Sequence, residues 1–190
     1  MTARDAAVVY LGNEVFKIPT EYLSSNKNFP DEIRKEDTVT ITLFLPDFSG
    51  LGDGKKLAGI GPYNPDRITA FWTMPAAGRS LDANRRLRSA FEFGLLERDE
   101  TLDTAVATGY RDPKDGGVAI IGPNVRGDDV LVQCSDGLVN SLCQFHFVDS
   151  QSNRGVVASF DRGRFAEWSD INEHLLLLID QWKEQTTRTK

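Results

Sequence analysis

The clearest chemistry in the chain belongs to its two cysteines, Cys134 and Cys143. They stand at the facing ends of two apolar runs, Val130–Cys134 and Cys143–Phe147, whose short connection predicts a β-hairpin. Directly opposed residues at a non-hydrogen-bonded site of an antiparallel pair lie about 4.5 Å apart at Cα, within reach of a disulfide. The spacing fits a cross-strand disulfide in an oxidising compartment such as the bacterial periplasm. The alternative is a cytoplasmic protein whose reduced cysteines pack as small hydrophobes.

The other residue types that carry catalysis or bind metals do not stand in a recognised spacing. His146 and His174 are the two histidines; neither belongs to a metal-ligand motif, and both are expected to be surface or boundary residues. No serine lies in a nucleophile-elbow motif. Carboxylate pairs could serve acid–base chemistry or bind calcium, but turn formation explains them equally well. No catalytic residue, metal site or cofactor is therefore predicted.

A segment rich in glycine and proline, Pro46–Pro65, resembles a binding loop more than a connection. About 20 residues without periodicity are unusual inside a compact domain and often form a binding loop. The Gly54-Lys55 pair invites comparison with a phosphate-binding loop, but Ser49 stands where that motif needs glycine, and Lys56 where it needs serine or threonine. Nucleotide binding is not predicted.

Two irregular segments, Pro46–Pro65 and Arg111–Asp129, carry the residues that could bind a protein partner. Aromatic and aliphatic anchors dominate interface energies, and carboxylates would steer a basic partner. The alternative is that both segments are solvated turns. The predicted partner-binding residues are Asp47, Phe48, Leu51, Asp53, Tyr63, Asp128 and Asp129.

The C-terminal part of the chain predicts a long amphipathic helix that begins near Phe165, with Asp161 as a plausible N-cap. The apolar run Leu175–Ile179 is too short to span a membrane, which needs about 20 residues. The helix must therefore cover an apolar surface. Spacings of three and four place these residues on one face: Phe165, Trp168, Ile171, Leu175, Leu178, Ile179 and Trp182.

Alternating patterns and turn signals predict strands through most of the remaining chain. Gly12-Asn13 joins a first hairpin, and Ser80 would cap a helix of about 14 residues with the apolar face Ala83, Leu87, Ala90, Phe91 and Leu95. Four arginines gather at that helix, either to grip an acidic partner or as a solvated face: Arg79, Arg85, Arg86 and Arg88. The predicted strands are 7–11, 15–18, 37–45, 67–74, 106–110, 118–121, 130–134, 143–147 and 155–160.

Because turns rather than helices join most of these strands, the predicted fold class is α+β, with a largely antiparallel sheet and the long C-terminal amphipathic helix packed on one face. The 190 residues fit a single domain, 1–190, with flexible ends at 1–6 and 186–190. The net charge of −6 disfavours nucleic acid and anionic membranes as partners. Met1–Asp5 lacks the apolar core of a signal peptide, so either the protein is cytosolic or a signal peptide or membrane anchor has been removed.

Several short stretches give a family resemblance: Phe16–Leu23, Leu45–Gly50, Cys143–Phe147 with Cys134, Ser159–Arg162 and Trp168–Ile171. Together they are similar to small periplasmic or membrane-anchored proteins encoded beside type VI secretion effectors, several of which act as immunity proteins. The resemblance implies a non-enzymatic protein that binds a cognate toxin effector in the periplasm and occludes its active site.

Three hypotheses follow from the sequence. The first is a protein-binding module, in its most concrete form an immunity protein. The second is a periplasmic small-molecule-binding domain that uses Pro46–Pro65 as a lid, for which a deep apolar pocket would be evidence. The third is a hydrolase with carboxylate chemistry, for which two close carboxylates with perturbed pKa values in a cleft would be evidence.

Overall fold

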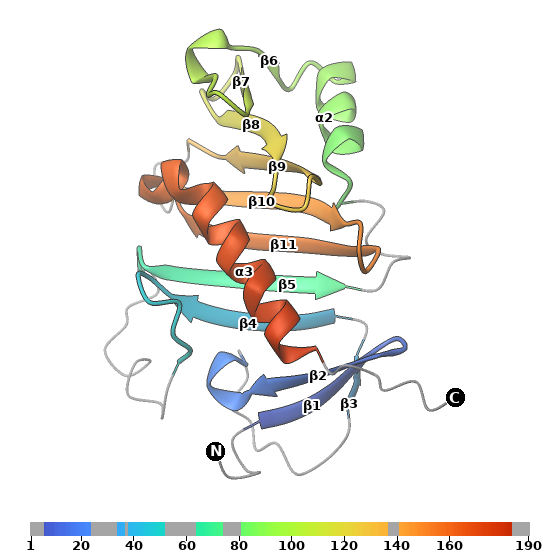
Figure 1. The fold of residues 1–190 in the computed structure, drawn as a ribbon. Coiled ribbons are helices and arrows are strands. Elements are labelled where there is room, and N and C mark those ends of the chain that lie inside the picture. The colour runs from blue at the N-terminus through green and yellow to red at the C-terminus, as the bar shows by residue number, and fades with distance from the viewer. Residues whose placement is uncertain are drawn as a thin grey trace.

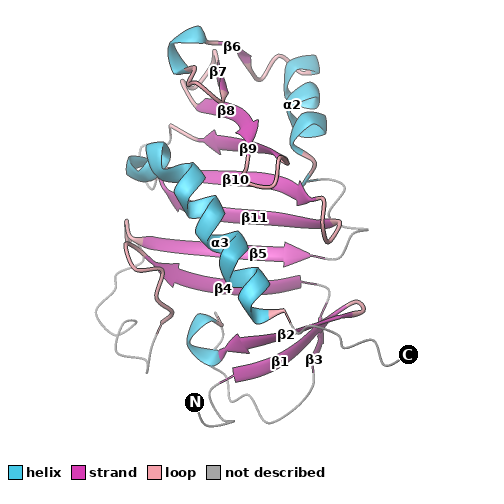
Figure 2. Ribbon diagram, viewed as in Figure 1, coloured by secondary structure: helices cyan, strands magenta, loops and turns pink. Residues whose placement is uncertain are grey.

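The computed structural model of the protein describes residues 6–23, 34–36, 38–51, 64–73, 81–136 and 141–183. These residues form a large sheet, a small sheet and two α-helices, and strands dominate the fold (Figures 1 and 2). In spatial order the large sheet comprises β4 (Thr38–Phe44), β5 (Arg67–Thr73), β11 (Arg154–Asp161), β10 (Leu142–Asp149), β9 (Asp129–Cys134), β8 (Val118–Pro123), β7 (Thr108–Arg111) and β6 (Glu97–Arg98). The small sheet comprises β2 (Glu14–Pro19), β1 (Ala6–Leu11) and β3 (Arg34–Glu36).

All neighbouring strands of the large sheet are antiparallel, whereas β3 joins the small sheet parallel to β1. The predicted α+β class with a largely antiparallel sheet is confirmed. Of the ends predicted to be flexible, 1–5 and 186–190 lie outside the described residues, while Ala6 is the first residue of β1.

The C-terminal helix α3 (Trp168–Trp182) runs across one face of the large sheet, over β10, β11, β5 and β4 (Figure 1). A 3₁₀-helix, Arg162–Glu167, precedes it, and the Asp161 carboxylate caps that segment by accepting a hydrogen bond from the Gly163 amide at 2.7 Å. The α-helix thus begins three residues later than the predicted start near Phe165. Its buried face also includes a polar residue, Asn172.

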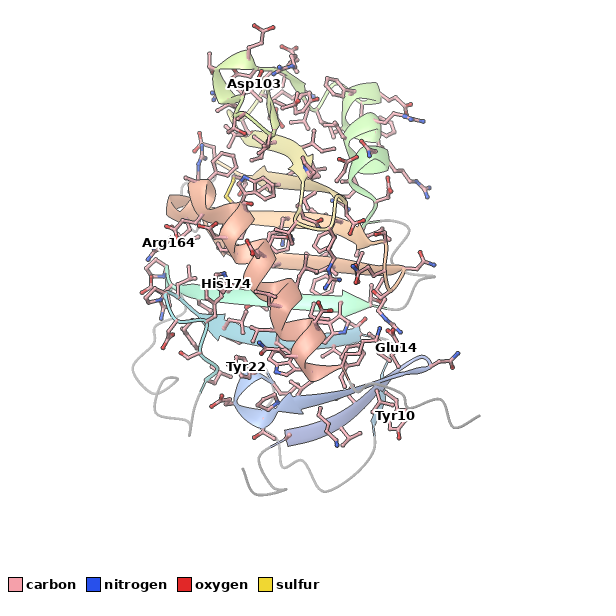
Figure 3. All side chains as sticks on the ribbon, viewed as in Figure 1. Tyr10, Glu14, Tyr22, Asp103, Arg164 and His174 are labelled. Atoms are coloured by element: carbon pink, nitrogen blue, oxygen red, sulfur yellow. A yellow bond between two sulfur atoms is a disulfide. The ribbon has the colours of Figure 1, made fainter. Side chains whose placement is uncertain are left out.

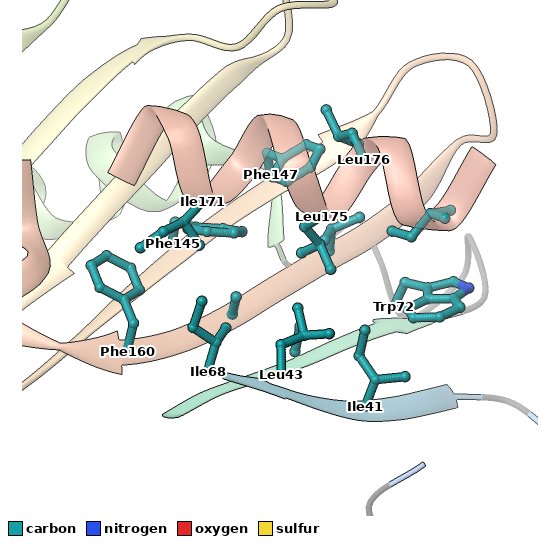
Figure 4. Close-up of a cluster of buried hydrophobic side chains, with 14 of the residues drawn as sticks. Ile41, Leu43, Ile68, Trp72, Phe145, Phe147, Phe160, Ile171, Leu175 and Leu176 are labelled. Carbon is teal, nitrogen blue, oxygen red and sulfur yellow. The ribbon is translucent and has the colours of Figure 1, made fainter. Parts of the chain in front are cut away.

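The core lies between α3 and the sheet (Figure 4). Its residues follow the alternation of the strands and the helical spacing of α3. On β10, Phe145 and Phe147 point toward α3, whereas Gln144 and His146 alternate to the opposite face. The strand 37–45 was predicted to have one buried and one solvated face. The solvated face, which carries the threonines, is in fact partly covered, because Thr42 and Phe44 are buried.

The second helix, α2 (Ala83–Glu92), covers the opposite face of the sheet beside β8 and β9. Val130 and Val132 of β9 face the α3 core, while Leu131 between them packs with Ala83 and Ala90 of α2. Ser80 lies outside the described residues, and the helix is capped by Asp82 instead, which accepts from the Arg85 amide at 2.7 Å.

The predicted apolar face of this helix is only partly correct. Ala83 and Ala90 are buried, but Phe91 is 41% exposed and Leu95 lies beyond the helix, which ends at Glu92. The chain turns away from the helix axis at Gly94, which has a left-handed backbone conformation with a φ of +63°. This conformation is unfavourable for a residue with a side chain.

Cys134 and Cys143 are directly opposed in the β9–β10 register, with their Cα atoms 4.0 Å apart, and they form a disulfide. The predicted cross-strand bond is therefore present in the structure. It closes the hairpin at the end of the sheet where β9 finishes and β10 begins. Within the described part of the chain, no helix is long and apolar enough to cross a membrane.

Candidate functional site

The first predicted binding segment begins with a tight turn after β4. Asp47 is exposed at its tip, and Phe48, with a φ of +53°, stacks its ring on His174 of α3 at 4.1 Å between centroids and 6° between planes. Figure 3 shows His174 on the exposed side of α3. Leu51 was expected to be an exposed anchor, but it is only 3% exposed and packs inward. The other two predicted contacts of this loop lie outside the described residues: Asp53 and Tyr63.

The second predicted segment ends in the β8–β9 turn, where the carboxylates have structural partners. Asp128 accepts hydrogen bonds from the Ser150 amide at 3.3 Å, and so connects this turn to the one between β10 and β11. Asp129 accepts from the Nδ2 of Asn84 at 2.6 Å and connects the start of β9 to α2. Both carboxylates therefore contribute to the fold, whatever else they contact.

Within the described residues, the turn that carries Asp47 and Phe48 and the turn that carries Asp128 and Asp129 lie at opposite ends of the large sheet. The turn that follows Phe44 lies at the end of the large sheet that also holds the Cys134–Cys143 bond. The turn that precedes Asp129 lies at the other end, where β10 finishes at Asp149. Since seven-residue strands are roughly 20 Å long, a single small contact cannot cover both turns.

A second surface lies where α2 meets the sheet, and it includes two of the four arginines noted in the sequence, Arg85 and Arg86; we call it the α2 groove. It consists of two adjoining hollows of about 490 and 360 Å³ that share Ala90, Leu95 and Gln133. The larger hollow extends along β9 and β10 past Gln144 to Leu142, beside the disulfide. The smaller one extends along α2 and is lined further by Arg85, Arg86 and Ser89.

Beside this groove two buried polar atoms have no hydrogen-bond partner, Nε of Arg86 and Nδ1 of His146. His146 was expected at the surface or its boundary, but it is only 5% exposed, because α2 covers its side of β10. Burial, together with the nearby Arg86 charge, lowers the pKa of His146 to about 4. Burial also lowers the pKa of Arg86. A partly buried guanidinium at the groove therefore lies near a buried imidazole.

One edge of the α2 groove is apolar and exposed. Phe91 contacts the ring of Tyr110 edge-on, at 5.2 Å between centroids, and this contact orients its exposed side chain. Phe93, Leu95 and Leu142 are 72%, 44% and 41% exposed. Large apolar side chains grouped beside arginines are typical of the centre of a protein interface.

Among the described residues, the carboxylates beside the groove and near the tip of the sheet do not form the arrangement expected of a hydrolase. Asp112 and Asp115 border the groove, yet each accepts a hydrogen bond from a backbone amide of its own turn. Near the tip of the sheet, Thr101 and then Arg111 lower the pKa of Asp99, and Arg98 lowers that of Asp103. A general acid would need a raised pKa. Among the described residues, no group of three or more histidine, cysteine, aspartate or glutamate side chains could hold a metal ion.

Comparison with known proteins gives a likeness of fold. No family model matches the chain, and no curated protein matches its sequence. An immunity protein of the Stenotrophomonas maltophilia type IV secretion system superimposes with a TM-score of 0.67 at 17% identity, over 95% of this chain and 94% of that one. The iron-regulated outer membrane lipoprotein FrpD of Neisseria meningitidis superimposes with a TM-score of 0.56 at 7% identity, over 94% of this chain and 92% of that one. The fold of most of the chain thus has counterparts among solved structures.

Proposed function

We propose that the protein is an immunity protein, which binds a cognate protein toxin delivered by a bacterial secretion system and occludes the toxin's active site. The observation that carries this proposal is the likeness of fold, over 95% of the chain, to an immunity protein of a type IV secretion system. The sequence resemblance points to a type VI effector instead, so the type of secretion system is left to experiment.

The periplasm is the proposed compartment. The Cys134–Cys143 disulfide requires an oxidising environment to persist. It links β9 to β10 beside the groove. The likeness to an outer membrane lipoprotein of Neisseria meningitidis supports the same compartment.

Burial leaves fewer of the partner contacts that we expected from the sequence. Asp47 and Phe48 remain proposed partner contacts, because both reach the surface in the turn after β4. Leu51 is removed because it is buried. The other residues remain proposals, either engaged in hydrogen bonds of the fold or outside the described ranges: Asp128, Asp129, Asp53 and Tyr63.

Co-expression tests the proposal. Each secreted effector encoded beside the gene, from either type of secretion system, is directed to the periplasm of a bacterial host with or without this protein. We expect one effector to lose its toxicity and to bind the purified protein with a nanomolar dissociation constant, as tight inhibitory pairs do. Undiminished toxicity of every effector, with the protein present in the periplasm and its disulfide verified by mass spectrometry, would contradict the proposal.

A further inference from the structure

The arginines of α2 differ from most others in the protein. Arg98, Arg111, Arg126, Arg154, Arg162 and Arg164 each form an ion pair with a carboxylate. Within the described ranges, Arg85, Arg86 and Arg88 form none, although the chain carries a net charge of −6. Among the residues that the structure describes, three positive charges of α2 therefore have no carboxylate partner, although the protein is rich in carboxylates.

Arg86 is the member of this group whose position is costly. Its Nε is buried without an acceptor, and it lies close enough to His146 to lower that pKa by charge. A guanidinium that is partly removed from water without an acceptor is unfavourable, and a carboxylate supplied from outside would offset that cost through a bidentate pair. The hollow that Arg86 lines, about 360 Å³, has room for such a side chain.

The surroundings add apolar contacts to this charge. Leu95 lies in both hollows, Leu142 lines the larger one, and Phe91 and Phe93 are exposed beside them. Arginines and aromatic residues supply most of the binding energy in protein interfaces, whereas small-molecule sites bury most of their ligand. An open groove with this composition fits a protein segment better than a small molecule.

We propose that the α2 groove is the docking surface for the partner protein, and that the partner inserts a segment that carries carboxylates and large apolar side chains. A carboxylate of the partner pairs with Arg86 and Arg85, and an apolar side chain packs on Leu95 and Leu142. The identity of this partner as a toxin rests on the proposed function. The pairing of a carboxylate with Arg85 and Arg86 does not, because these two arginines line the smaller hollow, whereas Asp112 and Asp115 line the larger one.

A peptide probe tests the groove without knowledge of the toxin. A fluorescent peptide of alternating glutamate and leucine or phenylalanine is titrated with the protein, and a second peptide has lysine in place of every glutamate. We expect the glutamate peptide to bind about tenfold tighter or more, with an affinity that falls as salt rises. Equal affinity for the two peptides would overturn the inference.

Variants locate the binding. Arg86→Glu should weaken the glutamate peptide about tenfold or more, and Arg85→Glu, at an exposed position, should act in the same direction. The matched control is Arg67→Glu, which makes the same charge change at an exposed position of β5 that lines neither hollow. If Arg67→Glu weakens the peptide as much as both α2 variants, the effect is one of net charge and the inference is wrong.

Once an effector is neutralised, two variants separate the proposed docking surface from the proposed immunity function. We expect Arg85→Glu and Phe93→Ser, both at exposed positions, to abolish protection while circular dichroism remains that of the parent. Protection that survives in both variants would overturn the docking surface and leave the immunity function intact. Absence of any neutralised effector, with the peptide result as expected, would overturn the immunity function and leave the docking surface intact.

Discussion

Arg154 and Glu14, 140 residues apart in the sequence, form an ion pair with 2.6 Å between Nε and Oε2. The same guanidinium donates from Nη2 to the carbonyl oxygen of Leu11 at 2.6 Å. The pair therefore joins the first hairpin to β11, and Figure 3 shows Glu14 where the small sheet approaches the large one. The side chain of Arg154 is only 6% exposed.

The Glu14→Ala variant should lower the free energy of unfolding by about 3 kcal/mol, because it removes the carboxylate that pairs with the buried Arg154 and also with Lys183. Denaturant unfolding measures the loss. Asp136→Asn is the control, since it breaks the more exposed pair with Arg162 and should cost less than about 1 kcal/mol. Equal losses in the two variants would show that the Glu14 pair has no special role in joining the sheets.

His146 should make the protein less stable in acid. Its pKa is about 4 when folded and about 6.5 when unfolded, so the unfolded chain binds a proton first as the pH falls. Stability should decline between pH 6.5 and 4, by about 3 kcal/mol at most, and this contribution should level off below pH 4. In His146→Leu the decline over the same range should be smaller by that amount. Parallel pH profiles of the free energy of unfolding would contradict the prediction.

Trp168 fills the first turn of α3 and is 5% exposed. Trp168→Ala should cost about 3–5 kcal/mol, because it leaves a large cavity between the helix and the sheet. Leu177→Ala on the same helix is the control, since Leu177 is 50% exposed and should cost less than about 1 kcal/mol. A loss below about 1 kcal/mol for Trp168→Ala in denaturant melts would mean that this position is not part of the core.

Reduction of the Cys134–Cys143 bond should cost about 2–3 kcal/mol, because it frees a short loop in the unfolded chain. Thermal melts with and without reductant measure the loss, and the Cys134→Ser/Cys143→Ser variant should not respond to reductant. Mass spectrometry after alkylation of the unreduced protein checks the bond itself. Two alkylated thiols in periplasmic material would disprove it and weaken the proposed location.

The turn after β4 can be tested separately from the α2 groove. Phe48→Ala should weaken binding of the neutralised effector about fivefold or more if this turn contacts the partner, and Tyr63→Ala tests the rest of the loop. Calorimetry measures both affinities. Because Phe48 also stacks on His174, each variant needs a melt to show that it is folded. If both variants bind as tightly as the parent, this loop is not part of the interface.

The sequence by itself determined the local elements. The hairpin that carries Cys134 and Cys143, the strand after Asp37 and the C-terminal helix all follow from periodicity, because alternation and helical spacing depend only on neighbours along the chain. The facing positions of the two cysteines followed as well, since they share one hairpin, whereas the choice between a disulfide and two reduced thiols was left open by the sequence and the bond is present in the structure.

The tertiary structure decided which faces of these elements are covered, and therefore the candidate site. Alternation placed His146 opposite Phe145, but only the position of α2 over that face buries it beside Arg86. Leu51 lies in an irregular segment without periodicity, so its burial could not be read from its neighbours. The pairing of Glu14 with Arg154 could not be predicted from the sequence either, because the two residues are 140 positions apart. Contacts between distant segments depend on how sheets and helices pack, and local sequence patterns do not encode that packing residue by residue.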